Sequence, residues 1–432
     1  MVARARSSAH VLEVYVYGPH VLGALALALS LIVSPSSALA QASHAVPLSL
    51  ADAISLAESH APEVALARHA VRQAEAQRVG AGVVMPQNPR LSVDARPVLR
   101  GGSPSDVGYA ATLDTLFDVG GAPSARVREA DRGADVAAAE LTMERREARA
   151  RAWATYVRVL VASERVREAR SATEISERVL RAARERADAG AAGDIDRTLA
   201  ESELAQATAN VSLAEQARER AIMDLRDALD LPADAALVLT TPLVSPGDVP
   251  PVEALTQRAL VRRADLATIQ KRVDLLSARR DRLEREVFPR VGAYLGVDAS
   301  PLSPLLGLVG VTVELPVAQR NQGPLARVSA ESEGERERLA LSARRALREV
   351  RERVDAYDAR RRELSLFESG SVPSATRTLE LVESGWRAGR FDVFRVTSAA
   401  RDLERARSLR LDALEAAWLE RIALDRAVGG LE

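Results

Sequence analysis

The chain has 432 residues, of which 47% are hydrophobic and 28% are charged, with 59 basic against 60 acidic residues. The resulting net charge of −1 argues against nucleic-acid binding, which requires a basic surface. The absence of cysteine excludes disulfide frameworks, thiolate metal sites, cysteine nucleophiles and a lipid anchor on a cysteine. Aromatic residues make up only 3%, and the abundance of Ala, Arg, Glu and Leu favours long helices.

The first forty residues have the pattern of a secretory signal peptide. Arg4 and Arg6 precede an apolar run over residues 21–33, and an A-x-A sequence occupies residues 38–40. The alternative is an N-terminal membrane anchor, but the run is shorter than the roughly 18 to 20 residues of a spanning helix. We therefore expect residues 1–40 to direct export and to be removed.

Sequence landmarks of the mature chain occur twice in the same order. One example is the A-R-V triplet at 125–127, which returns 201 residues later at 326–328. Short amphipathic helices, alternating segments, long charged helices and glycine breaks keep nearly the same offset. This order predicts a tandem duplication with its seam at Pro250-Pro251. The expected organisation is a first repeat at 41–250 and a second repeat at 251–432.

Each repeat contains a long helical segment. From Pro123, a favourable first-turn residue, no proline interrupts the pattern before Ala189, a length of about 66 residues or roughly 100 Å. Small and apolar residues recur there at steps of three and four, which is coiled-coil spacing. The second copy matches from Pro324 onward, except that Gly370 and Pro373 must bend or break the helix. A simple soluble coiled coil would have the same periodicity.

Four segments alternate at period two and form two predicted hairpins, at about 90–117 and 290–315. Each segment has the length of a tilted strand crossing a bilayer, with an apolar face and a face of small or polar residues. Leu113 and Val311 lie on the apolar face, and Thr112 lies on the other. The charged residues of the polar face are Asp94, Arg96, Asp114, Asp298 and Glu314.

Four strands are too few to close a barrel. If these strands lie in a membrane, several chains must share one barrel, because open edges in lipid leave backbone groups unpaired. The alternative for the strands alone is a small soluble sheet that caps a helical rod.

The mature chain, Gln41 to Glu432, resembles the TolC-type outer-membrane efflux proteins over essentially its whole length. The segments that carry the resemblance are Leu48 to Ala76, the QNPRLSV entry to the first strand, LFDVGGAPSARV after the second, Glu314 to Ala326, and Gly385 to Gly429. The resemblance implies a mainly α fold with a small β part, in which duplicated coiled-coil hairpins form an α-barrel.

The same resemblance implies a homotrimer in the bacterial outer membrane, each chain giving four transmembrane strands to one shared β-barrel. The long helices would form a periplasmic tunnel that docks onto a periplasmic adaptor protein and an inner-membrane pump, of the resistance-nodulation-division type. The RNQG stretch, Arg320 to Gly323, looks like the branch that serves heavy-metal cation exporters.

The resemblance also gives the glycine breaks a role. They would be turns of helical hairpins at the periplasmic tip, where adaptors bind and the tunnel closes. The expected tip residues are Gly190, Gly193, Asp196, Gly389, Arg390, Asp392 and Arg395. In TolC itself, acidic residues six and nine positions after the second tip glycine line the closed aperture. Here those positions hold Arg395 and Ser398, so an acidic gate ring is not carried over.

Catalytic signatures are lacking in the sequence. His60 and His69 are nine residues apart and out of phase on a helix, and no His/Cys pair has metal-ligand spacing. We find no phosphate-binding glycine loop and no G-x-S-x-G elbow. We therefore expect no enzyme activity, no cofactor and no metal site.

The sequence and its resemblance favour a passive exit duct of a tripartite efflux system. The alternative is a secreted periplasmic coiled-coil scaffold without a pore. A periplasmic adaptor would not predict two equivalent strand-helix halves.

Overall fold

The computed structural model describes residues 46–100, 103–188, 193–300 and 303–430, so the predicted signal peptide at 1–40 and the tip residue Gly190 lie outside it. In chain order the elements are β1 (Val46–Leu48), α1 (Leu50–His60), α2 (Pro62–Ala81), β2 (Arg90–Arg100), β3 (Ser103–Phe117), α3 (Ala122–Asp188), α4 (Asp194–Ala228), β4 (Leu237–Leu239), α5 (Val252–Arg262), α6 (Ala264–Arg285), β5 (Arg290–Ser300), β6 (Ser303–Glu314), α7 (Gln322–Leu366), a π-helical turn (Phe367–Ser371), α8 (Val372–Arg387) and α9 (Val393–Val428). None of the described helices is long and apolar enough to cross a membrane.

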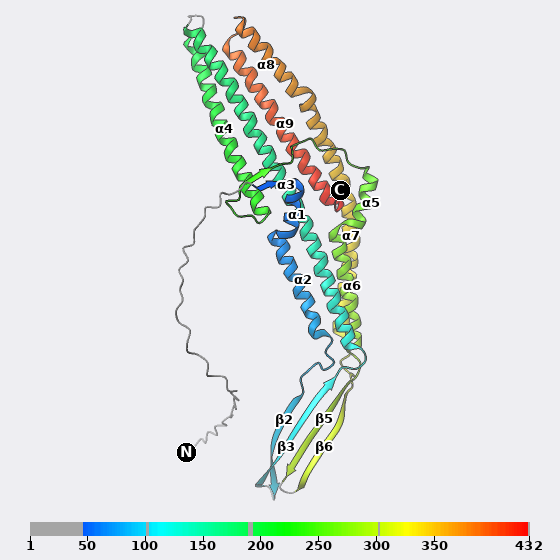
Figure 1. Cartoon of the computed structure of the whole chain (residues 1–432). Helices are drawn as coiled ribbons and strands as arrows, with labels where there is room; N and C mark the ends of the chain where they lie inside the picture. The colour runs from blue at the N-terminus through cyan, green and yellow to red at the C-terminus, as the bar shows by residue number, and fades with distance from the viewer. Residues whose placement is uncertain (1–45, 101–102, 189–192, 301–302, 431–432) are drawn as a thin grey trace, which may run out of the picture. The chain divides into compact units, whose positions relative to one another are not determined.

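The same order of elements occurs twice along the chain. Two helices, a β-hairpin and a long helical hairpin occur first as α1 to α4 and then as α5 to α9 (Figure 1). The mainly helical fold with a small β part is therefore confirmed. The division at residue 250 stays a prediction, although a segment without helix or strand joins β4 to α5 there.

The long helices form as the sequence predicts. Helix α3 runs unbroken through 67 residues, beginning next to Pro123. In the second repeat the corresponding helix is interrupted, as expected, by the π-helical turn that contains Gly370 and is followed by Pro373. A π-helical turn inserts an extra residue into the helical ladder, and it divides α7 from α8. The two repeats therefore differ in the continuity of their longest helix.

The hairpins join into one antiparallel sheet with the order β2-β3-β5-β6. The register aligns residues of equal parity, so Leu91, Leu113, Leu295 and Val309 form one row across the sheet. Side chains in such a row share one face because successive residues of a strand point to opposite sides. The predicted alternation of apolar and polar faces is thus present in the folded sheet.

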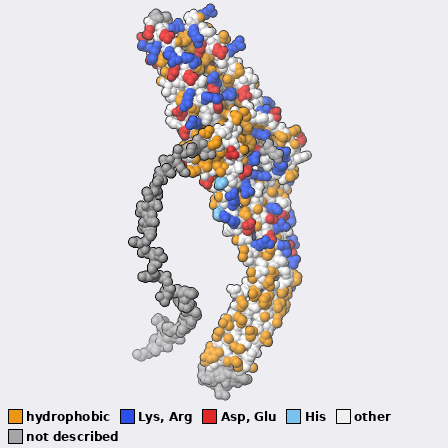
Figure 2. Space-filling model, viewed as in Figure 1, with side chains coloured by type: hydrophobic (Ala, Val, Ile, Leu, Met, Phe, Trp, Pro, Cys, Tyr) orange, Lys and Arg blue, Asp and Glu red, His pale blue; other side chains and the backbone are white. Residues whose placement is uncertain are grey.

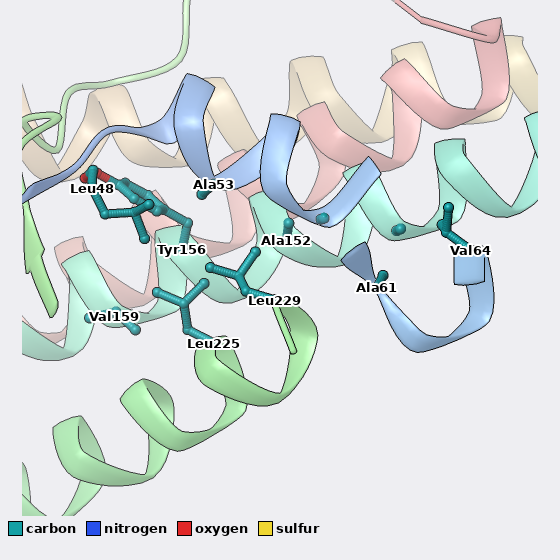
Figure 3. Packing of buried hydrophobic residues seen from close by; sticks show 11 residues of the cluster. Leu48, Ala53, Ala61, Val64, Ala152, Tyr156, Val159, Leu225 and Leu229 are labelled. Carbon is teal, nitrogen blue, oxygen red and sulfur yellow. The ribbon is translucent and has the colours of Figure 1, made fainter. Parts of the chain in front are cut away.

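A hydrophobic cluster joins the first repeat's helices to the short β1–β4 pair (Figure 3). Tyr156 of α3 is fully buried there, and its hydroxyl donates to the carbonyl of Leu48 at 2.9 Å. The same hydroxyl accepts a hydrogen bond from the amide of Thr241 at 3.2 Å. Strand β1 and the segment that follows β4 are thereby fixed to α3.

Charged residues between the helices are paired. Arg279 of α6 contacts Glu129 of α3 at 2.8 Å, and Arg407 of α9 contacts Glu168 of α3 at 2.8 Å. These ion pairs connect α3 to α6 and to α9. These pairs are only partly buried, and ion pairs that keep contact with water contribute about 1 kcal/mol or less, so the buried clusters account for more of the stability.

Candidate functional site

One face of the sheet is apolar and left uncovered. Hydrophobic side chains dominate the sheet surface in Figure 2, and Val309 is 86% exposed. The exposed large apolar residues of this face are Leu91, Val93, Val107, Tyr109, Leu113, Leu295, Val297, Val309, Val311 and Val313. Contiguous apolar surface of this kind marks a partner or a membrane.

The opposite face carries the predicted charged residues. The register places Asp94 in the row of Ala110, Asp298 and Leu306, and it places Asp114 in the row of Arg90. Arg96 and Glu314 have the same parity and share this face. All five predicted lumen residues therefore lie on one side of the sheet, opposite Leu113 and Val311, and Thr112 lies on their side.

Two ion pairs connect charges on this polar face. Arg96 lies 3.6 Å from Asp298, and Arg290 lies 3.9 Å from Glu314. The sequence analysis missed two apolar residues here, Leu306 and Leu308, which share the face because they oppose Asp298 and Gly296. Strand β6 begins at Ser303, and these two leucines interrupt the alternation expected for this hairpin.

Small residues let side chains lie close to this face. Tyr294 lies over Gly310, where an added Cβ would come within 2.3 Å of its ring. A Cβ on Gly296 would likewise approach the carbonyl oxygen of Ala111 at 2.9 Å. Larger residues at these two glycines would force the sheet or the tyrosine to move.

A buried carboxylate joins the sheet to the helices, and the sequence analysis did not identify it. Asp118 is 3% exposed at its side chain and pairs with Arg126 at 2.5 Å and with Arg290 at 3.1 Å. Arg126 also donates to the carbonyls of Ala81 and Val83, at the end of α2. This cluster ties the first repeat to the first residue of β5 in the second repeat. Asp118 lies in the LFDVGG segment of the sequence, and Arg126 lies in the first A-R-V triplet.

The second helical hairpin turns at the predicted glycine. Gly389 has φ +75°, a left-handed conformation that favours glycine, and its amide donates to the carbonyl of Trp386. Asp392 then caps α9 by accepting from the amide of Arg395 at 3.0 Å. The guanidinium of Arg395 lies 5.3 Å from the ring centroid of Phe391, within cation–π range.

The first hairpin begins its return helix at Gly193. Gly193 is the N-cap residue of α4, and its carbonyl accepts from the amide of Asp196. Asp194 and Asp196 occupy the first turn of α4, where the positive end of the helix dipole stabilises their negative charges. The predicted Gly190 lies outside the described residues.

Aromatic and aliphatic residues hold the two hairpin ends together. Arg186 of α3 donates to the carbonyl of Trp386 at 3.0 Å, and its guanidinium lies 5.8 Å from the indole ring. The sequence analysis missed both residues, because the contact joins two repeats. In the first turns of α4 and α9, Ile195 is 82% exposed and Phe394 is 60% exposed. The hairpin ends therefore present apolar side chains as well as charges to a partner.

The described residues contain no group of three or more His, Cys, Asp or Glu side chains placed to hold a metal ion. His60 contacts the hydroxyl of Ser59, and His69 contacts Arg72 on the same helix. The polar face of the sheet and the hairpin ends are thus the two candidate sites. Both can bind or guide a partner or solute.

The sequence profile described as "Outer membrane efflux protein" matches residues 53–230 and 255–430. The chain belongs to this outer membrane efflux protein family. It is 26% identical over 326 residues to the cobalt-zinc-cadmium resistance protein CzcC of Cupriavidus metallidurans, an alignment that covers 74% of this chain and 76% of the relative.

Solved structures share the fold. A membrane protein from Pseudomonas aeruginosa matches with a TM-score of 0.73 and 20% identity, covering 90% of this chain and 92% of the other. The outer membrane protein VceC of Vibrio cholerae matches with a TM-score of 0.70 and 18% identity, covering 88% and 96%. The resemblance to the TolC-type efflux proteins is therefore confirmed. The roles of individual residues in this family member stay predictions.

Proposed function

We propose that this family member is the outer-membrane channel of a tripartite efflux system, a passive duct from the periplasm to the exterior. The observation that carries the proposal is the sheet with an uncovered apolar face and a charged opposite face. A lipid-facing strand alternates in this way when its other face lines a polar lumen. A soluble scaffold has no need for such a sheet, and it would gain stability by covering it.

The sheet alone cannot serve as a channel, because β2 and β6 are edge strands in the described sheet. Unpaired backbone groups at these edges would each cost several kcal/mol in lipid. Pairing β6 of one copy with β2 of the next removes both edges when the ring closes. Three copies would give a twelve-stranded barrel in the bacterial outer membrane, the homotrimer that the resemblance implies.

The helical hairpins would continue this duct into the periplasm. Their ends, with Gly193, Asp196, Gly389, Arg390, Asp392 and Arg395, would contact a periplasmic adaptor and through it an inner-membrane pump of the resistance-nodulation-division type. The exposed Ile195 and Phe394 support this assignment, because apolar side chains at the centre of a docking surface supply much of its affinity. Energy would come from the pump.

Heavy-metal cations are the proposed cargo. Support comes from the similarity to CzcC, whose name states cobalt, zinc and cadmium resistance, and from the RNQG stretch. A duct needs no tight metal site, since tight binding would slow release. If these cations are the cargo, deleting the gene should sensitise cells to cobalt, zinc or cadmium. Restoring the gene should reverse the effect.

Cell fractionation with a carbonate wash tests the channel against the scaffold. We expect the processed protein in the outer membrane, released only by detergent, and a trimer on chemical cross-linking. Recovery from the soluble periplasm would overturn the channel and favour the scaffold. Retention as a monomer would overturn the shared barrel.

A further inference from the structure

The Arg96–Asp298 ion pair spans a whole strand. Arg96 is on β2 and Asp298 is on β5, and β3 lies between them. The register places Gly108 opposite Arg96 and Ala110 opposite Asp298. These small residues leave room for the long arginine side chain to cross above β3. Ala110 is only 4% exposed, as expected if charged side chains cover it.

The pair changes which charges of the polar face are available. Among the described side chains, Asp298 is compensated by Arg96, and Glu314 lies near Arg290. Asp114 has Arg90 directly opposite it in the ladder, although the two form no ion pair. Asp94 has no ion-pair partner in the described part of the chain. Arg96 therefore cancels a carboxylate that would otherwise add to Asp94.

We infer that Arg96 is a specificity-determining residue that limits the preference of the channel for cations. This inference rests on the proposed function, because the polar face must line a lumen. Charges of one sign in a confined lumen raise the local concentration of counter-ions. With three chains in one barrel, every change at Arg96 or Asp298 occurs three times around the lumen. Removing Arg96 would free three carboxylates and remove three positive charges.

Reversal potentials in planar bilayers test this inference, with a KCl gradient and the purified full-length chain. We expect Arg96→Gln to raise the permeability ratio of K⁺ to Cl⁻ about three-fold at 0.1 M salt, and less at 1 M because of screening. Arg96→Lys, which keeps the charge, is the matched control and should stay near the wild-type ratio. Asp298→Asn should lower the ratio, and the double variant should return it towards wild type.

The outcomes separate this inference from the proposed function. If wild-type protein forms no channels, the proposed function fails and the inference fails with it. If channels form but both Arg96→Gln and Asp298→Asn leave the ratio unchanged, the inference is overturned and the channel stands. Should Arg96→Gln fail to assemble, the ratio of Asp298→Asn decides, since a decrease supports the inference and no change overturns it.

Discussion

The sheet and the helical hairpins of this chain place apolar residues in opposite ways. In the helices many apolar residues are buried between helices, as at Tyr156 and Val350. In the sheet, apolar residues such as Val93 and Val309 are exposed, and the charged residues share the other face. One chain is thus built for two surroundings, water around the helices and lipid around the sheet.

The helical region and the sheet obtain their stability from different contacts. The helical region contains several buried hydrophobic clusters formed by residues of this chain alone, so it can fold around them. The sheet has an apolar face without a partner in the chain, so its stability depends on lipid and on neighbouring copies. Substitutions should therefore affect folding in the helices and assembly in the sheet.

Tyr156→Ala should have the largest effect on folding. It removes a fully buried ring and both hydrogen bonds to the segments beside β1 and β4. Such a truncation costs about 3–5 kcal/mol. Thermal unfolding followed by helical circular dichroism should show a large decrease in the melting temperature of Tyr156→Ala. Tyr156→Phe should lose only about 1–2 kcal/mol of the free energy of unfolding. Equal stability of Tyr156→Ala and wild type would contradict the role of this cluster.

Asp118→Ala tests the junction between the two regions. Removing the carboxylate leaves the Arg126 guanidinium largely buried without its partner and also separates Arg290 from the first repeat. We expect a loss of about 2–3 kcal/mol, less than for a fully buried pair because both arginines keep some contact with water. Denaturant unfolding in detergent would measure it. A neutral result would mean that the contacts of Arg126 with Ala81 and Val83 hold the junction alone.

Leu113→Asp should spare the helices and impair assembly of the sheet. A carboxylate on the lipid face costs on the order of 1–2 kcal/mol per chain, and a trimer would carry three. The yield of cross-linked trimer should fall several-fold, with the same result for Val311→Asp. Thr112→Asp, on the neighbouring residue but on the charged face, is the matched control and should assemble. Equal yields for all three variants would refute the assigned orientation.

Local patterns made much of this molecule predictable. Alternation at period two identified both hairpins and their faces, and the absence of proline after Pro123 identified α3. The turn at Gly389 was predicted from the glycine break and the family resemblance, and the left-handed φ of Gly389 agrees with it. The strand faces were predictable because each depends on neighbouring residues alone.

Contacts between distant segments were not predictable in this way. The parallel pairing of β1 with β4 involves three-residue strands that no periodic pattern marks. The cluster of Asp118, Arg126 and Arg290 joins two repeats, and one chain's spacing does not reveal which charges meet. Leu306 and Leu308 do not follow the expected alternation, because the first half of β6, which begins at Ser303, has apolar residues on both faces.

A smaller, pH-dependent effect is expected at the start of α6. Asp265 pairs with Arg263 at 2.9 Å, and Arg263 also reaches Glu349 of α7. Burial favours the neutral acid, but the hydrogen bonds and charge of Arg263 outweigh it and lower the pKa of Asp265 below 3.8. The pair therefore stabilises fully above pH 3.8 and loses its contribution as the pH falls through the lowered pKa. Asp265→Asn should cost about 1 kcal/mol or less at pH 7, and its unfolding curve should converge with wild type in acid.

The smallest effect on stability is expected at the hairpin end, where a change should alter function alone. Arg395 is exposed and contacts the ring of Phe391, so Arg395→Ala should change the free energy of unfolding by less than about 0.5 kcal/mol. Trimer yield should stay at the wild-type level, while single-channel conductance or cross-linking to the adaptor changes. Arg401→Ala, farther along the same helix and paired with Glu203, is the control for loss of an exposed arginine. If Arg395→Ala alters neither conductance nor cross-linking, the Arg395 side chain is only solvated, and contact with the adaptor must be sought at Ile195 and Phe394.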